Sequence, residues 1–371
     1  MSPRMQPVRL LLLSGASLVG QNVVAALQGR RAGVWLAAMN SVAAEPALSD
    51  FDEAYLCGNL RDDREAFARR FVEVLERVDP QLVIPCRDDD VAFLAAFAES
   101  CPAVAPRLLC GSRATAQAML DKLESAALSS RHRLPYAPTI DAAGPQRALR
   151  DFAATQGMPL VAKPRQGFAS RGVFLVLDQA QLERVAGRPD YVLQRYLGDP
   201  HDVMRRVRQM AEEGMPLFHT FEAVKLSIQA FIAPDGSLAG LCATRNIMRQ
   251  GRSERIELDA DAALEELGRR CAAAFAGEGW RGPLNIQCQR APDGELAIYE
   301  FNGRYTGATA ARALLGYDEV GIGLAAFCGA ALPAAPTPGV AVAVRVPLTR
   351  MVDAEQADRL REIGHWRVAH D

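Results

Sequence analysis

The stretch GPLNIQCQRAPDGELAIYEFNGR, residues 282–304, decides how the fold of this chain is interpreted. It predicts two apolar strands on either side of Asp293-Gly294, a pair typical of a tight hairpin turn. Such a hairpin can bring Gln287, on the first strand, beside the polar residues that end the second strand.

The second strand of this hairpin ends in a row of polar residues. Side chains two residues apart in a strand point to the same face, so Glu300, Asn302 and Arg304 are expected to project together. Carboxylate and amide oxygens are hard ligands, which suit Mg²⁺ on nucleotide phosphates better than zinc. An ordinary strand with a polar solvent face is the alternative. Ile298 and Phe301 look buried, however, and such a row is an unusual way to decorate a surface.

A second constellation, AKPRQGFASRGV at 162–173, ends an apolar strand in a lysine and continues through a glycine-containing turn. Glycines let backbone N–H groups approach an anion, while Lys163, Arg165 and Arg171 neutralise its charge. The turn can therefore fold over phosphates, although by itself it is equally consistent with a basic surface loop. Residues 191–197 form an apolar strand with a polar end, which can offer adenine backbone groups and apolar walls.

The N-terminal part, residues 8–110, alternates short apolar runs with amphipathic helical patterns, which is typical of βαβ units around a parallel sheet. The expected strands cover 8–13, 34–39, 54–57, 82–85 and 108–110. The segment Gly15 to Gly20 lacks a full GxGxxG, so a tight strand-to-helix turn is favoured over a dinucleotide site. Asp88 to Asp90 precede an apolar helix, and a helix cap is favoured over a substrate role.

The pattern changes near residue 114. A helix there, another at 146–156, and strands at 160–163, 173–177 and 191–194 predict a small α+β lobe. The larger lobe is expected to contain strands at 224–232, 238–245 and 340–346 and helices at 262–275 and 310–327. The predicted fold class is a doubly wound parallel-sheet α/β domain, 1–113, followed by two α+β lobes, 114–192 and 193–371. The polar segment 198–222 is expected to be a helical insertion or a mobile element.

Composition sets outer limits on function. The chain has 371 residues, 49% of them hydrophobic and 23% charged, with a formal net charge of -2, which favours two or three packed units. This balance gives no sign of a nucleic-acid or anionic-membrane partner. Eight scattered cysteines without a CxxC pair indicate core residues in a reducing compartment. With no apolar run near twenty residues, we expect a cytoplasmic protein.

Taken in order, several motifs resemble the ATP-grasp superfamily, especially members similar to the large subunit of carbamoyl-phosphate synthetase. They are Asp121-Lys122, the Lys163 loop, Gln194, Gln287 and Glu300-x-Asn302-x-Arg304. The resemblance spans roughly residues 8–330, and its most specific part is 282–302. It implies an N-terminal α/β domain followed by two lobes that hold ATP between them. The family commonly has Pro between the metal-binding Asn and the Arg, where this chain has Gly303.

The resemblance also implies roles for individual residues. The implied nucleotide-binding set is Lys122, Lys163, Gly167, Ser170, Gly172, Gln194, Arg195, Tyr196 and Leu197, with Asp199 and Glu222 as the two candidates for the acid that holds the ribose. One or two Mg²⁺ ions, with Mn²⁺ as a substitute, would be bound by Gln287, Glu300 and Asn302. The implied catalytic set is Arg304, Lys163 and Arg245. Arg245 and Lys225 are candidates to face the substrate carboxylate, and for Lys225 an exposed strand position is an equal alternative.

The implied function is an ATP-dependent ligase. It would activate a carboxylate as an acyl phosphate, couple it to an amine and release ADP and phosphate. The expected partners are small-molecule carboxylate and amine substrates, and the resemblance favours a homodimer. An ATP-grasp kinase or a carbamoyl-phosphate-like synthase would use the same ATP site. An NAD-dependent oxidoreductase leaves the Glu300 row unexplained, and an inactive nucleotide-binding module remains a further alternative.

Overall fold

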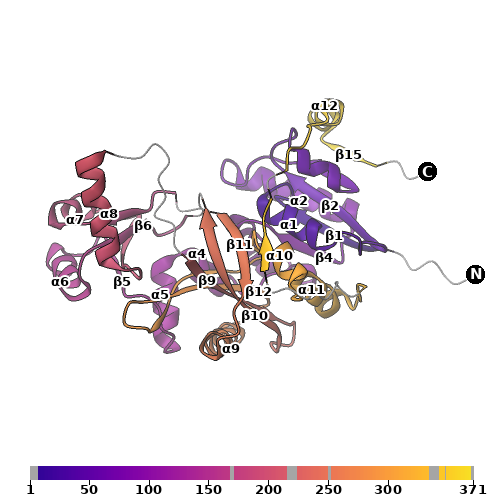
Figure 1. Ribbon diagram of the computed structural model, residues 1–371. Helices are drawn as coiled ribbons and strands as arrows, with labels where there is room; N and C mark the ends of the chain where they lie inside the picture. The colour runs from indigo at the N-terminus through magenta and orange to yellow at the C-terminus, as the bar shows by residue number, and fades with distance from the viewer. Residues whose placement is uncertain are drawn as a thin grey trace, which may run out of the picture.

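The computed structural model describes residues 7–167, 171–214, 224–249, 252–333, 342–346 and 348–368. Within them lie three sheets of five, four and six strands, each in its own unit along the chain (Figure 1). The parallel sheet followed by antiparallel sheets confirms the predicted mixture of α/β and α+β units. No helix in these ranges is both long and apolar enough to span a bilayer.

The first unit is a twisted sheet with strand order β15-β3-β2-β1-β4, in which the first four strands along the chain are parallel. Its strands are β1 Val8–Leu13, β2 Val34–Asn40, β3 Glu53–Leu56 and β4 Leu82–Pro85, and its helices include α1 Leu18–Ala26, α2 Arg64–Val78 and α3 Asp88–Ser100. Leu10 to Leu13 are fully buried, as expected for a strand covered on both faces. The predicted strand at 108–110 is wrong: the 3₁₀ turn Ala105–Arg107 precedes a single bridge between Val83 and Leu108.

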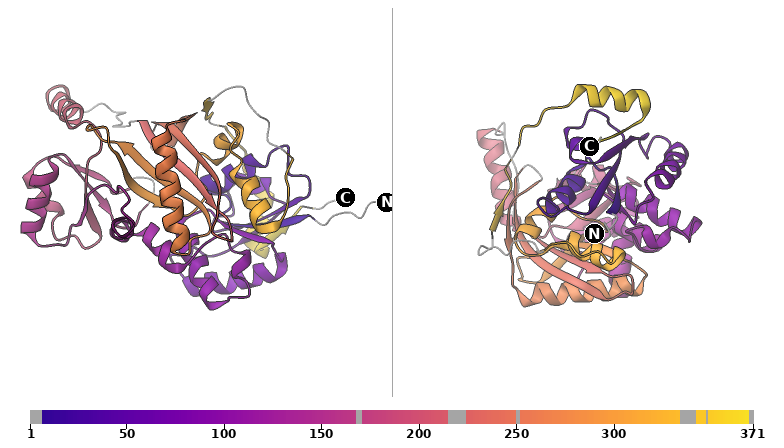
Figure 2. Two further views of the ribbon diagram at one scale, coloured as in Figure 1. Left: turned by 90° about the horizontal axis from the view of Figure 1, so that it is seen from below. Right: turned by 90° about the vertical axis from the view of Figure 1, so that its right-hand side faces the viewer.

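The second unit is a small antiparallel lobe that stands apart from the rest (Figures 1 and 2). Two helices, α4 Arg113–Leu120 and α5 Lys122–Arg131, lead into it and are separated by Asp121, which caps α5. The lobe contains β5 Thr139–Asp141, α6 Gln146–Gln156, β6 Leu160–Pro164, β7 Phe174–Val176, α7 Gln179–Val185 and β8 Tyr191–Arg195. Its apolar core is its own. The expected lobe boundary at 192/193 falls inside β8.

The third unit carries the largest sheet, with strand order β13-β12-β9-β10-β11-β14 and antiparallel neighbours throughout. Its strands are β9 Val224–Ile232, β10 Leu238–Arg249, β11 Arg252–Leu258, β12 Gly282–Arg290, β13 Leu296–Asn302 and β14 Val342–Val344. The helix α9 Ala262–Gly277 packs on the face that bears Ile228. The predicted helix at 310–327 is two helices, α10 Thr309–Leu314 and α11 Glu319–Cys328, and α11 packs on the opposite face, against Phe231.

Two features join the first and third units. One hydrophobic cluster runs from the first sheet, with Leu11 and Val83, into the third, with Ile228 and Phe301. The chain also returns to the first unit through α12 Ala354–Ile363 and β15 His365–Arg367, which pairs antiparallel with β3 (Figure 1). The helix α8 Pro200–Glu213 lies beyond β8 and agrees with the expected helical insertion, whose remaining residues after 214 lie outside the described ranges.

Candidate active site

The hairpin predicted at 282–304 forms, and its register places the polar residues in two facing pairs. Gln287 lies opposite Glu300, and Asn285 lies opposite Asn302. A bulge shifts the register at Gln287/Cys288 and leaves Tyr299 without a partner residue on β12. Glu300 and Asn302 share one face with Gln287, because paired residues of neighbouring strands lie on the same face. The extra residue lets Ile298 and Phe301, three positions apart, both be buried on the other face.

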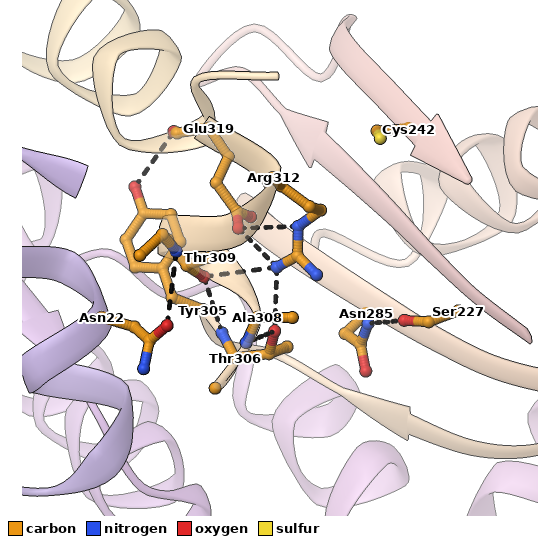
Figure 3. Close-up of polar contacts among 12 residues, drawn as sticks. Asn22, Ser227, Cys242, Asn285, Tyr305, Thr306, Ala308, Thr309, Arg312 and Glu319 are labelled. Atoms are coloured by element: carbon orange, nitrogen blue, oxygen red, sulfur yellow. Dashed lines mark hydrogen bonds and ion pairs between the residues drawn. The ribbon is translucent and has the colours of Figure 1, made fainter. Parts of the chain in front are cut away.

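The next strand, β9, extends this polar face. Ser227 is opposite Gln287 across the β12–β9 pair, and its hydroxyl accepts a 2.9 Å hydrogen bond from Asn285 Nδ2 (Figure 3). Asn302 Nδ2 in turn donates to Asn285 Oδ1 at 3.5 Å. Sequence reasoning missed Asn285 and Ser227. For Asn285 a signal existed, since it alternates with Gln287 in the most specific stretch of the chain.

The donor set fits Mg²⁺ only together with another oxygen source. Among the described residues, no three Asp, Glu, His or Cys side chains lie close enough to hold a metal ion by themselves. Glu300 supplies the carboxylate of this face, and Gln287 and Asn302 supply amide oxygens. Mg²⁺ is usually bound by one or two carboxylates and by substrate phosphates. These three residues therefore fit a magnesium ion that ATP phosphates also ligate.

Arg304, just beyond β13, is held by an acidic residue of the first unit. Its Nε and Nη2 donate to the two oxygens of Asp88 at 2.7 and 2.9 Å, and Nη2 also lies 3.3 Å from Asn302 Oδ1. The helix cap predicted for residues 88–90 is provided by Asp90, whose carboxylate accepts the backbone N–H groups of Arg87, the N-cap residue, and of Cys86. Asp88, in the same first turn, instead holds Arg304.

Two buried lysines face this hairpin from the small-lobe side. Lys163 Nζ donates to Gln194 Oε1 at 2.7 Å and to the Tyr299 carbonyl at 2.9 Å. Burial lowers the pKa of Lys163 to about 7; Glu300 opposes this shift, and the charges of two other lysines add to it. Lys122 is 7% exposed, and its Nζ lies 3.4 Å from the Arg165 carbonyl.

Comparison with known proteins identifies the fold. No family model matches the chain, and no curated protein matches its sequence. Among solved structures, it is similar to the biotin carboxylase domain dimer of 2-oxoglutarate carboxylase from Hydrogenobacter thermophilus, in complex with MgADP, ADP and bicarbonate. That match has 17% identity and a TM-score of 0.64, and covers 88% of this chain and 71% of the other. N5-carboxyaminoimidazole synthetase from Staphylococcus aureus, complexed with ADP, matches at 12% identity and a TM-score of 0.66, covering 92% and 81%.

The chain has the ATP-grasp fold. In this fold the residues described so far lie where the second and third units meet, with the first unit closing one side through Asp88. The remaining predicted site residues can be placed in the same frame.

The segment predicted to hold adenine, residues 194–197, lies at the end of the small lobe and contacts the third unit. Gln194 is buried, and its Nε2 donates to the Thr139 hydroxyl at 2.9 Å. The Arg195 guanidinium pairs with Asp293 of the hairpin turn at 2.9 Å. Leu197 packs with Ala137 and Ala291 in a small apolar cluster. Tyr196 follows on the same strand end. This segment is thus in contact with the hairpin of residues 282–304.

Other predicted residues differ in how they lie. Gly167 and Gly172 are described, and Gly172 has a φ of +72° with no room for a side chain against Tyr191. Ser170 and Glu222 lie outside the described residues. Asp199 caps α8 by accepting the His201 N–H, so a ribose role would compete with this bond.

Two arginines for which the sequence predicted ligand contacts pair with acidic residues of the protein. The Arg165 guanidinium is bound by Asp121 at 2.8 Å, so its charge is already balanced within the protein. Arg245 is exposed and lies 3.8 Å from Asp259, whereas its neighbours Thr244 and Asn246 are buried. Successive side chains of a strand alternate between faces. Arg245 therefore points away from the site, and its predicted catalytic role is not supported by this geometry.

A cavity of about 170 Å³ lies on the polar face of the large sheet. Lys225, Asn246 and Gln287 line it from the sheet, Arg304 and Gly307 from the following loop, and Leu18 from α1 of the first unit. Three cationic side chains face it in all, the third being Arg345. A cavity with this lining favours an anionic ligand.

The loop that carries Arg304 is fixed from beneath by a buried ion pair (Figure 3). Arg312 and Glu319 are 1% and 0% exposed, and Arg312 Nη2 lies 2.5 Å from Glu319 Oε1. The same Nη2 donates to the hydroxyls of Thr306 at 2.9 Å and Thr309 at 3.2 Å. Because Thr306 lines the cavity, this pair holds part of the cavity wall in place.

Gly303 leads to the first testable prediction. A Cβ at this position would lie 2.5 Å from Met119 Cε and 2.6 Å from the buried Trp280 ring. Gly303→Ala is therefore expected to destabilise the protein by roughly 1–3 kcal/mol through overpacking. A fall in the thermal unfolding midpoint, measured by circular dichroism, would show this. Gly277→Ala is the matched control, because no atom lies within 4 Å of the added Cβ; equal midpoints for the two variants would contradict the prediction. The same atoms would crowd any larger residue at this position, proline included.

Proposed function

We propose that the protein is an ATP- and Mg²⁺-dependent ligase that joins a small carboxylic acid to an amine through an acyl phosphate. One observation carries the proposal: the Gln287–Glu300 and Asn285–Asn302 pairs lie side by side on one face of a hairpin. The Lys163 ammonium donates a hydrogen bond to the backbone carbonyl of Tyr299, next to Glu300. Arg304 lies at the other end of the same row. The lysine proposed to bind phosphate, the proposed metal ligands and the arginine proposed to bind the acid thus follow one another along this hairpin.

The proposed reaction proceeds in two steps. A carboxylate oxygen of the acid attacks the γ-phosphorus of ATP, and the bond from this phosphorus to the bridging oxygen breaks, with the electron pair leaving on ADP. The amine nitrogen then attacks the acyl carbon. Phosphate leaves with the electron pair of the broken C–O bond, and the nitrogen loses a proton.

Each residue has a role that follows from its charge and position. Lys122 and Lys163 neutralise phosphate oxygens from the small-lobe side. Arg304, oriented by Asp88, stabilises the negative charge on the acid and on the tetrahedral intermediate. Bound Mg²⁺, held by Gln287, Glu300 and Asn302 with the phosphates, would offset charge that develops on the transferred phosphoryl group. Positioning and charge neutralisation can supply this catalysis without a protein nucleophile.

The proposal extends to the substrates, the location and the oligomeric state of the enzyme. Both substrates would be small molecules, and the site would be in a cytoplasmic protein. A homodimer is part of the proposal, supported by the dimeric carboxylase domain to which the chain is similar. A kinase would share the first step and stop there. The bicarbonate named for the carboxylase neighbour favours an acid activated for transfer.

ADP release from MgATP, measured across a matrix of small carboxylic acids and amines, tests the proposal. ADP formation that requires one acid and one amine, with an equal amount of amide product, would support a ligase. ADP formation with the acid alone and a stable phosphorylated product would establish the kinase instead. Failure to bind ATP would overturn both the ligase and the kinase hypothesis. Glu295→Gln, an exposed position on the same hairpin, serves as a control that should retain activity.

A further inference from the structure

The chain contains 42 lysine and arginine residues, and only three of them are lysines: Lys122, Lys163 and Lys225. On an open surface either residue can supply a positive charge. A lysine offers what an arginine does not, a compact ammonium on a flexible stem that fits into a crowded anion site. In a chain whose cations are otherwise arginines, the position of each lysine is therefore informative.

All three lysines come together in the folded protein. They lie on different elements: Lys122 starts α5, Lys163 is on β6 and Lys225 is on β9. The charges of Lys122 and Lys225 both act on Lys163 and help to lower its pKa. The Nζ atoms of Lys163 and Lys225 lie 5.8 and 6.0 Å from the centre of the Tyr299 ring. Like charges repel, and among the charges that act on Lys163 one carboxylate, Glu300, faces the two other lysines, so the grouping favours binding of a further anion.

Lys225 differs from the other two lysines in its contacts. Lys122 and Lys163 each have a hydrogen-bond acceptor. Among the described residues, Lys225 has neither an ion pair nor a hydrogen bond, although it is only partly exposed and lines the cavity. Directly opposite it on β10 lies Asn246, 6% exposed, whose buried Oδ1 has no hydrogen-bond partner in the part of the chain that the structure describes. The Lys225 ammonium and the Asn246 amide oxygen, on neighbouring strands, can therefore each form a hydrogen bond with a bound molecule.

The strand register shows where these two residues lie relative to the proposed metal ligands. Ser227 is opposite Gln287, and Lys225 lies two residues beyond it on β9, on the same face and away from Asn285. Lys225 and Arg304 line the same cavity, but Arg304 is next to Asn302, the partner of Asn285, whereas Lys225 is near Tyr299 and Lys163. Lys225 is therefore at the end of the cavity that faces the two lysines proposed to bind phosphate.

We propose that Lys225 is a third phosphate-binding lysine of the nucleotide site, and that Asn246 beside it contacts the same nucleotide. The inference rests on the proposed function, because it assigns these residues to the ATP of that reaction. It replaces both interpretations of Lys225 that the sequence allowed, a residue facing the substrate carboxylate and an exposed strand residue.

Equilibrium binding of MgATP to the full-length protein tests this assignment. Lys225→Met is expected to weaken the affinity by roughly 10- to 100-fold, since it removes a hydrogen bond to a charged group, while the KM for the acid changes less than about twofold. Lys225→Arg should recover part of the affinity. Arg269→Met is the matched control: among the described residues, this exposed arginine of α9 pairs only with Glu265, one turn away on the same helix, and α9 packs on the opposite face of the sheet.

A second measurement does not depend on activity. Reductive methylation with ¹³C-formaldehyde gives a dimethylamine signal for each lysine that reacts, beside that of the N-terminal amine, and the Lys225→Arg variant assigns the Lys225 signal by its loss. MgATP is expected to shift the Lys225 signal together with those of Lys122 and Lys163.

The outcomes are distinguishable. A Lys225→Met variant that keeps its ATP affinity, or a Lys225 signal that does not move while the other two do, overturns the assignment. If Lys225→Met raises only the KM for the acid, Lys225 contacts the substrate carboxylate and not the nucleotide. If the unaltered protein binds no MgATP, the proposed function itself fails, whatever the Lys225 variants do.

Discussion

Glu300→Gln is expected to lower acid-dependent ADP formation by about 1,000-fold, because it removes the carboxylate from a site whose other protein ligands are neutral amides. The substituted amide has nearly the same shape, and Glu300 is not part of the apolar core. The fold is therefore expected to persist, with an unchanged circular dichroism spectrum. The loss should be in kcat, measured by steady-state ADP release at saturating MgATP.

Two controls sharpen this experiment. Glu295→Gln removes a carboxylate from the exposed turn of the same hairpin and should leave kcat within about twofold, as expected for a surface change away from the site. Raising the Mg²⁺ or Mn²⁺ concentration should partly restore the Glu300→Gln variant if the lost group is a metal ligand. If the variant keeps more than a tenth of the normal kcat, Glu300 is not a ligand of the catalytic metal.

MgATP affinity is expected to fall by about 25-fold between pH 6.5 and 8.5, as proton linkage to Lys163 requires. Burial lowers the pKa of this ammonium to about 7, and a bound phosphate would raise it again. Below about pH 7 Lys163 is already protonated and the affinity should be flat. Above it, binding must take up a proton, so the affinity decreases as pH rises. The groups that influence this titration are Glu300, Lys122 and Lys225.

Isothermal titration of MgATP at several pH values, in buffers of different ionisation enthalpy, would measure both the affinity and the proton uptake. Lys163→Arg is the informative variant, because its guanidinium stays charged over the whole range. It should abolish most of the pH dependence even if its overall affinity is lower. A flat profile in the unaltered protein would show that Lys163 is not the linked group.

Much of the site was predictable because its geometry is local. The turn at Asp293-Gly294 fixes which residues of the hairpin face each other, and only twelve residues lie between the paired Gln287 and Glu300. The alternation rule then places Glu300 and Asn302 on one face. The row from Gln287 to Arg304 could therefore be assigned from residue types and spacing alone, and the structure brings its members together.

What could not be predicted depends on contacts between distant segments. The Asp88–Arg304 pair joins residues 216 positions apart, and nothing near Asp88 distinguishes it from a helix cap. The Asn285–Ser227 contact depends on β9 lying beside β12, an order that no local pattern encodes. The charge of Arg165 was assigned to phosphate because its partner Asp121 lies 44 residues earlier in the chain. For Arg245, the strand was predicted but not the face that each of its residues occupies.

The return of the chain to the first sheet through β15 bears on the order in which substrates can enter. The first and third units share a hydrophobic cluster, and the strand pairing of β15 with β3 adds a second link, whereas the small lobe has its own core. Opening of the nucleotide cleft would therefore be a movement of the small lobe alone. The acid end of the row, between Asp88 and Arg304, lies within the part that stays fixed. Nucleotide exchange and acid exchange would then not require the same movement, and neither substrate would have to wait for the other to leave.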